Sequence, residues 1–185
     1  MGGAMKTNES GTSLIEVMIA TMFMTIALLS VAMTMVQGIA AVNISQEQLI
    51  AKQKAQEALE SVFTARNTQE ITFAQIQNTN VTGGIFLTGF QPVRGMGIDG
   101  IANTADDSAD PIESFTMAGP DDNLGTGDDT TMSLSSYQRK ITISSVLTVT
   151  SVVDPDIRKI DVVVSYVVRG ITKTVTVSSL ISRFS

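Results

Sequence analysis

An uncharged run near the amino terminus restricts the fold more than any other feature of this sequence. Residues 17–46 contain no charged side chain, and residues 14–36 are apolar apart from Glu16, three Thr and one Ser. A helix of about 20 residues crosses a hydrocarbon core of ~30 Å, so the run is long enough to span a membrane. Because a secretory signal peptide has an apolar region of only ~7 to 15 residues, we expect this segment to stay in the mature chain.

The helical pattern continues beyond the uncharged run. Apolar side chains recur at helical spacing and fall on one face: Ile44, Ala51, Ala55, Ala58, Leu59 and Val62. Three charged side chains fall on the opposite face: Lys54, Glu57 and Glu60. We therefore expect one amino-terminal helix over residues 12–66, ~80 Å long at about 1.5 Å per residue. Residues 12–38 would be its transmembrane part, and residues 39–66 an amphipathic part that carries a globular head.

The composition argues against two classes of function. The chain has 12 Lys and Arg against 18 Asp and Glu, a formal charge of -6. This is the wrong sign for a surface that binds phosphates by counterion release, so we do not expect nucleic acid as a main partner. The sequence has no Cys and no His, which removes thiol nucleophiles, imidazole bases and the commonest zinc ligands. We therefore expect no enzymatic activity.

Glu16 is the unusual residue of the amino-terminal segment. A carboxylate in or near hydrocarbon is costly and by default has a partner. Glu16 follows Gly11 by five residues in the string G-T-S-L-I-E-V-M-I-A at residues 11–20, and a short polar stretch precedes this string. The combination resembles the class III signal of type IV pilins and of type II secretion pseudopilins.

This resemblance implies a processed filament subunit. Residues 1–11 would be a leader peptide, cleaved between Gly11 and Thr12 by prepilin peptidase, with N-methylation of Thr12. The helix would then pack into a filament core, where the amino group of Thr12 pairs with Glu16 of a neighbouring subunit. Breaking one half of such a buried pair costs about 3–5 kcal/mol. The alternative is a plain membrane anchor in which Glu16 reaches the lipid headgroups. A start at Met5 in place of Met1 would give a shorter leader.

Residues 67–185 are predicted as a β-rich head, so the expected fold class is α+β, a long amino-terminal helix packed on a small antiparallel β-sheet. Residues 159–169 and 171–181 alternate apolar and polar side chains, which predicts a β-hairpin. Residues 137–150 are also β-prone, and Asp154-Pro155-Asp156 predicts a turn after them. We expect the Val face to be buried and Thr, Ser, Lys and Arg to face water. A helix laid on an antiparallel sheet that ends in such paired strands resembles the heads of minor pilins in the pilus modification family and of some minor pseudopilins.

The loops of this head are acidic at residues 99–129, which hold nine acids and no base. A pattern recurs after 22 residues, at residues 99–107 and 121–129. Calcium takes about six to eight oxygen ligands from carboxylates, amides and carbonyls. The candidate ligands are Asp99, Asn103, Asp106 and Asp107 in the first repeat, and Asp121, Asn123, Asp128 and Asp129 in the second. The second repeat also resembles acidic loops of major pseudopilins, which implies one bound calcium. The alternative is a mobile, solvated loop without a ligand.

The function expected from these features is that of a minor type IV pilin, a structural subunit without catalysis. It would be stored in the bacterial inner membrane by a single span and then assembled into, or prime, a pilus-like filament in the periplasm or at the cell surface. Its partners would be membrane lipid before assembly, other pilin or pseudopilin subunits through the amino-terminal helix, prepilin peptidase and the inner-membrane assembly platform. A minor pseudopilin of type II secretion is the nearest alternative. From other classes come a single-pass membrane-anchored calcium-binding or adhesive module and, third, an anchored hydrolase that uses the Asp cluster.

Overall fold

The computed structural model describes residues 13–184, and they have an α+β fold. A long amino-terminal helix is packed on a small antiparallel β-sheet, which confirms the predicted fold class. The chain divides into two compact units, Met1–Ile44 and Ser45–Ser185. In chain order the elements are α1 (Leu14–Asn67), η1 (Phe73–Gln75), β1 (Gln91–Pro92), η2 (Asp106–Ala109), β2 (Ser114–Met117), β3 (Thr130–Ser133), β4 (Gln138–Leu147), β5 (Val153–Val168) and β6 (Ile171–Ser182).

The first part of α1, residues 14–44, carries apolar side chains all round the helix, with few polar ones among them. All of its Leu, Ile, Val, Met and Phe side chains as far as Val42 are exposed. By length and composition the helix can cross a membrane, with a mean hydropathy of 2.2 in its most apolar window. It therefore fits a membrane anchor or a signal sequence.

The second part of α1, residues 45–67, contributes one face to the core of the head. The buried positions on it are Ile50, Ala51, Ala55, Ala58, Ser61, Val62 and Ala65. The predicted core positions Ala51, Ala55, Ala58 and Val62 are confirmed, whereas Ile44 and Leu59 are only half-buried. The Ala side chains are small, so the sheet can approach the helix closely.

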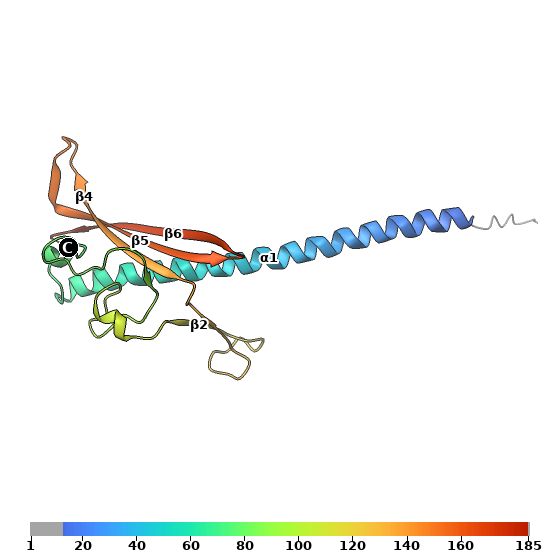
Figure 1. Ribbon diagram of the computed structural model, residues 1–185, viewed down its shortest axis with the longest axis horizontal. Helices are drawn as coiled ribbons and strands as arrows, with labels where there is room; N and C mark the ends of the chain where they lie inside the picture. The colour runs from blue at the N-terminus through green and yellow to red at the C-terminus, as the bar shows by residue number, and fades with distance from the viewer. Residues whose placement is uncertain (1–12, 185) are drawn as a thin grey trace, which may run out of the picture. The chain divides into compact units, whose positions relative to one another are not determined.

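The head sheet has the strand order β1-β4-β5-β6, and every neighbouring pair is antiparallel. Figure 1 shows β5 and β6 lying along the second part of α1. These two strands pair without interruption from Ile157 with Ser182 to Val168 with Ile171, which confirms the predicted hairpin. Its turn has positive φ angles of 51° and 77° at Arg169 and Gly170, as the favoured two-residue hairpin turn requires. The predicted alternation is also present, because five core-facing residues of β5 are buried: Ile160, Val162, Val164, Tyr166 and Val168.

The turn predicted at Asp154-Pro155-Asp156 is wrong, because these residues lie inside β5. The chain reverses at residues 148–152, where the Thr148 N–H donates to the Val152 carbonyl at 2.8 Å. β4 pairs Ser145 with Arg158 and then Val146 with Asp154. Residues 155–157 of β5 therefore have no partner on β4 and form a bulge in the β4–β5 ladder. A bulge is one of the few places in a sheet that tolerates Pro. Beyond it, residues 146–154 form a two-stranded ribbon, here called the arm (Figure 1).

Two basic residues contradict the expectation that they face water. Arg139 is fully buried, in alternation with the buried Tyr137 and Ile141. The Lys54 side chain is only 13% exposed, because its ammonium group pairs with both Glu57 and Glu113. The segment leading into β2 therefore covers a helix face that periodicity alone assigns to solvent.

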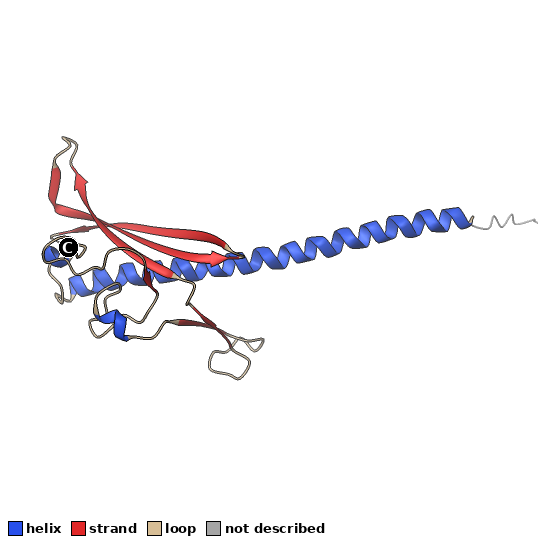
Figure 2. Cartoon of the chain, viewed as in Figure 1, coloured by secondary structure: helices blue, strands red, loops and turns tan. Residues whose placement is uncertain are grey.

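Between α1 and β4 the chain is mostly loop, interrupted by short elements (Figure 2). Apolar side chains of this segment complete the core of the head: Ile71, Phe73, Ile76, Phe86, Val93, Ile101 and Leu134. β2 and β3 form a separate two-stranded sheet. The second acidic repeat lies in the connection between them, whereas the first lies against the core.

Candidate functional site

The hydroxyl groups in the first part of α1 form hydrogen bonds within the helix itself. Each donates to a backbone carbonyl three or four residues earlier, at 2.8 to 2.9 Å: Thr21 to Met18, Thr25 to Met22, Ser30 to Ile26 and Thr34 to Ser30. In lipid or in a dry protein core no water would bond to these groups, so the internal partner removes the cost of burying them. The helix surface from Thr21 to Thr34 is thereby suited to an apolar environment.

Glu16 lies in the first turn of α1. A carboxylate at this end of a helix interacts favourably with the helix dipole. Within residues 13–184 the Glu16 carboxylate forms no ion pair. Gly11 and Thr12, the predicted cleavage site and new terminus, lie outside the described residues.

The first acidic loop, residues 97–107, is organised around the hydroxyl of Thr104. This oxygen lies 2.6 Å from Asp106 Oδ1 and 3.5 Å from Asp99 Oδ1. Asp99 Oδ1 also accepts the Ile101 N–H at 2.8 Å, and Asp106 Oδ2 accepts the Asp99 N–H at 3.2 Å. The carboxylates thus bond to the backbone of their own loop and fix its path.

The second acidic loop, residues 119–129, repeats these bonds one for one. The Thr126 hydroxyl lies 2.6 Å from Asp128 Oδ1 and 3.3 Å from Asp121 Oδ1. Asp121 Oδ1 accepts the Asn123 N–H at 2.9 Å, and Asp128 Oδ2 accepts the Asp121 N–H at 3.3 Å. Each atom pair occurs 22 residues after its counterpart, so the sequence repeat is also a structural repeat.

The last carboxylate of each loop makes a third equivalent bond. Asp107 Oδ2 accepts the Asn103 N–H at 2.7 Å, and Asp129 Oδ2 accepts the Gly125 N–H at 2.6 Å. Asn103 and Gly125 both have positive φ, 65° and 90°. Asn103 therefore corresponds to Gly125 and not to Asn123, so the two predicted Asn ligands occupy different places in the repeat.

Sequence reasoning missed two positions of this repeat. Thr104 and Thr126 hold the loops together, as described above. Gly97 and Gly119 leave room for a carboxylate, because a Cβ at these positions would lie 2.2 Å from Asp106 Oδ2 and 2.3 Å from Asp128 Oδ2. The signal was available as an extended repeat, G-x-D-x-x-x-x-T-x-D-D, at residues 97–107 and 119–129.

The hydrogen bonds of Thr104 and Thr126 have the same electrostatic effect in both loops. The bond from Thr104 lowers the pKa of Asp106, and the bond from Thr126 lowers the pKa of Asp128. Both carboxylates are thereby favoured in the ionised form, which is the form that binds cations. Burial instead raises the pKa of Asp99.

The first acidic loop is attached to the core through Arg139. The Arg139 Nε–H donates to Asn103 Oδ1 at 2.8 Å, and the Asn103 amide donates to the Arg139 carbonyl at 3.1 Å. Arg139 Nη2 lies 3.8 Å from Asp107 Oδ2. Burial raises the pKa of Asp107 to about 6, and the Asn103 N–H and the charge of Arg139 oppose this only in part. The Asn103 side chain therefore hydrogen-bonds to Arg139. The carboxylates are the remaining candidate metal ligands of this loop.

The carboxylates of the first acidic loop converge. Asp99, Asp106 and Asp107 each place one oxygen within 4.8 Å of the other two. Within residues 13–184 no other three acidic side chains meet at this distance, and Asp121, Asp128 and Asp129 do not. The arrangement suits a hard cation, which prefers carboxylate oxygens. The nearby Arg139 supplies part of the compensating charge, so hydrogen bonds and this ion pair already stabilise the loop.

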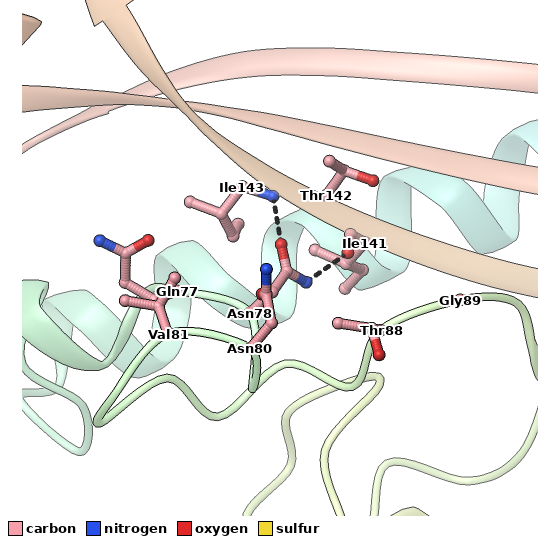
Figure 3. Close-up of a pocket in the computed structure, with 9 residues that line it drawn as sticks. All are labelled: Gln77, Asn78, Asn80, Val81, Thr88, Gly89, Ile141, Thr142 and Ile143. Atoms are coloured by element: carbon pink, nitrogen blue, oxygen red, sulfur yellow. Dashed lines mark hydrogen bonds between the residues drawn. The ribbon is translucent and has the colours of Figure 1, made fainter.

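A polar pocket of about 260 Å³ lies beside β4 (Figure 3). Its lining residues are Gln77, Asn78, Asn80, Val81, Thr88, Gly89, Ile141, Thr142 and Ile143. None of these side chains is ionisable, so the lining offers no acid or base. The Asn78 side chain lies between the pocket and β4. Its Nδ2 donates to the Ile141 carbonyl and its Oδ1 accepts the Ile143 N–H, both at 2.8 Å. The side chain therefore occupies the edge of β4 as a neighbouring strand would.

Comparisons with known proteins do not assign a family or a function to this chain. Comparisons of the chain with protein-family models, curated proteins and solved structures give no match. The function is therefore inferred from the residues of this chain.

Proposed function

We propose that this chain is a minor type IV pilin, a non-catalytic subunit that prepilin peptidase cleaves and that assembles into, or primes, a pilus-like filament. The observation that carries the proposal is the position of Glu16 at the start of α1, five residues after Gly11. The self-satisfied hydroxyls of the uncharged run support it, because they suit both a bacterial inner membrane and a filament core. In the membrane the chain would span once before assembly, with its head in the periplasm.

Glu16 would set the position of each subunit in the filament. After cleavage, the free amino group of Thr12 in one subunit would pair with the Glu16 carboxylate of its neighbour. Leaving either charge unpaired in a dry core costs about 3–5 kcal/mol, so the pair would favour one axial position of the helix over others. Other pilin subunits, prepilin peptidase and the inner-membrane assembly platform would be the partners of this helix.

Intact mass tests the cleavage step. The full chain is expressed in cells with and without prepilin peptidase, extracted from membranes and weighed by mass spectrometry. We expect loss of residues 1–11 and addition of one methyl group on Thr12 only where the peptidase is present. The same unprocessed mass in both strains would contradict the proposal.

A Glu16→Gln variant tests the assembly step. The amide keeps the size of the side chain but removes the charge that would pair with Thr12. We expect the variant to be retained in the membrane and to enter filaments at least tenfold less than the unaltered chain. Glu60→Gln is the matched control, because Glu60 is exposed on the same helix outside the uncharged run.

A minor pseudopilin of type II secretion shares this leader and remains the related proposal. The two are separated by phenotype. Deletion of a type IV pilin removes surface pili, whereas deletion of a pseudopilin blocks release of secreted proteins and leaves surface pili intact.

A membrane-anchored calcium-binding module is the second candidate, and the convergence of Asp99, Asp106 and Asp107 favours it. These three carboxylates would hold the ion in the first acidic loop, and calcium would supply positive charge that offsets their repulsion. The test is a titration of the full chain with Ca²⁺ by calorimetry and by melting temperature. We expect heat and a raised melting temperature, both lost in Asp106→Asn and kept in Asp122→Asn, whose side chain is exposed. No heat and no shift in melting temperature would end this candidate.

A further inference from the structure

The pocket beside β4 carries hydrogen-bonding groups that the fold itself does not use. Its lining comes from two loop segments and from β4 (Figure 3). Within residues 13–184 the side chains of Gln77, Asn80 and Thr88 make no hydrogen bond to another residue. Two amides and one hydroxyl, each able to donate and to accept, are therefore free to bond to a ligand.

The edge of β4 adds a backbone donor and a backbone acceptor to this lining. Asn78 bonds to the Ile141 carbonyl and to the Ile143 N–H, so both groups point to this edge. The N–H and the carbonyl of one residue in an antiparallel strand point to the same side. The Ile141 N–H and the Ile143 carbonyl therefore also point to this edge. Within the described part of the chain, no hydrogen bond joins either group to the neighbouring loops.

The chemistry of the lining restricts the class of ligand. No lining side chain is ionisable, so a charged ligand would lose its water without gaining a counter-charge. A fully apolar ligand would cover the free polar groups without bonding to them, which is also unfavourable. The volume of about 260 Å³ lies just below the ~300–1,000 Å³ of sites that bury a drug-sized molecule. The pocket therefore suits one small, uncharged ligand that is rich in hydrogen-bonding groups.

An extended peptide does not fit this edge, although peptides often add a strand to a sheet. β1 already pairs with Gln138 and Arg139, and the Asn78 side chain already bonds at Ile141 and Ile143. Strand addition needs consecutive free backbone groups along the edge. Only isolated groups remain here, so the ligand must be compact.

We propose that this pocket binds one neutral sugar unit. Each sugar hydroxyl donates and accepts hydrogen bonds, as do the free groups of Gln77, Asn80 and Thr88. The C–H groups of a sugar ring would contact the apolar part of the lining, which includes Val81. The inference goes beyond the proposed filament function and does not depend on it, because the pocket lies entirely in the head.

Saturation-transfer NMR tests the binding. The uncleaved full chain is purified in a detergent without a sugar headgroup, since a maltoside or glucoside would compete. The probes are glucose, galactose, mannose, N-acetylglucosamine and N-acetylgalactosamine. Each is tested free and as its methyl glycoside, because only a glycoside represents the end of a glycan chain. We expect transfer to at least one probe with a Kd on the order of 1 mM, because the sugar hydroxyls replace bound water.

Single substitutions locate the site. Gln77→Ala and Asn80→Ala each remove one free amide and should raise the Kd about three- to tenfold, the equivalent of one hydrogen bond. Thr79→Ala is the matched control, because Thr79 is exposed in the same loop but does not line the pocket. Its Kd should equal that of the unaltered chain. Melting temperatures of all three variants check that the head stays folded.

The outcomes separate this inference from the filament function. No transfer to any neutral probe, or the same Kd in all three variants, would overturn the sugar site. Tighter binding of glucuronate than of glucose would overturn the uncharged class of ligand. Because the measurement uses the uncleaved chain, neither result bears on cleavage or on entry into filaments, which intact mass and Glu16→Gln test independently.

Discussion

Asn78 should contribute more to the stability of the head than its polar character suggests. The residue is 9% exposed, and its side chain bonds to two backbone groups of β4, the Ile141 carbonyl and the Ile143 N–H. Replacing it with Ala leaves both groups without a partner. A buried backbone group without a partner costs about 1–3 kcal/mol. The adjacent pocket of about 260 Å³ is polar and roomy enough for water, which would recover part of the loss.

We therefore expect Asn78→Ala to lower the free energy of unfolding by about 2–4 kcal/mol, from the loss of the two bonds and partial replacement by water. For a domain of this size the melting temperature should fall by roughly 5 to 15 °C. Asn78→Asp should be no better, because it keeps an acceptor for the Ile143 N–H but loses the donor to Ile141.

The measurement uses tyrosine signals in the full chain in detergent. The sequence has two Tyr and no Trp. Tyr137 and Tyr166 are buried and stacked, with ring centroids 5.5 Å apart, so near-ultraviolet circular dichroism follows unfolding of the head. Asn80→Ala is the matched control, because Asn80 lines the same pocket but is exposed. A loss below about 0.5 kcal/mol for Asn78→Ala, the range of ordinary surface changes, would refute the reasoning.

Three further outcomes follow from the first acidic loop and its contact with the core. The pKa of Asp107 is raised from 3.8 to about 6, so the folded chain binds this proton more tightly than the unfolded chain. Unfolding free energy measured from pH 4 to pH 7 should therefore fall as the pH rises towards about 6, and Asp107→Asn should remove that part of the slope. Arg139→Met should cost about 3–5 kcal/mol in urea unfolding, because it leaves Asp107 buried without its counter-charge. Gly97→Ala should lower the melting temperature, because its φ of 61° disfavours Ala and its Cβ would meet Asp106 Oδ2. An unchanged melting temperature for the last variant would contradict this account of the loop.

Periodicity predicted the parts of the fold that bury one continuous face. The alternation of Ile160, Val162 and Val164 identified β5, and the spacing of Ala51, Ala55 and Ala58 identified the core face of α1. In both cases burial alone determines which residue type is needed at each position, so the pattern is visible in the sequence.

The sequence did not reveal the positions where a partner distant in the chain decides burial. Arg139 occupies a core position on β4 because Asn103 and Asp107 supply its partners. Lys54 is covered because Glu113 reaches it from the segment before β2. A charged side chain at such a position looks the same in the sequence as one in water, since only the folded chain brings its partner close.

The candidate site was predicted in part. The repeat at residues 99–107 and 121–129 was visible, and the structure brings Asp99, Asp106 and Asp107 together. The roles of the two Thr and two Gly were missed, because a search for metal ligands counts carboxylates and amides and gives no weight to groups that shape the backbone. The turn at Asp154-Pro155-Asp156 was misplaced for a related reason, because a bulge and a turn accept the same residues.

The unequal surroundings of the two acidic loops make them unequally tolerant of sequence change. In the first loop, Asn103 hydrogen-bonds to a fully buried Arg139 and Asp107 forms an ion pair with it, so substitutions at these two positions alter the core as well as the loop. In the second, Asp121, Asp122 and Asp128 are exposed on a connection between two short strands. The charge and the length of the second loop can therefore change while the head keeps its fold.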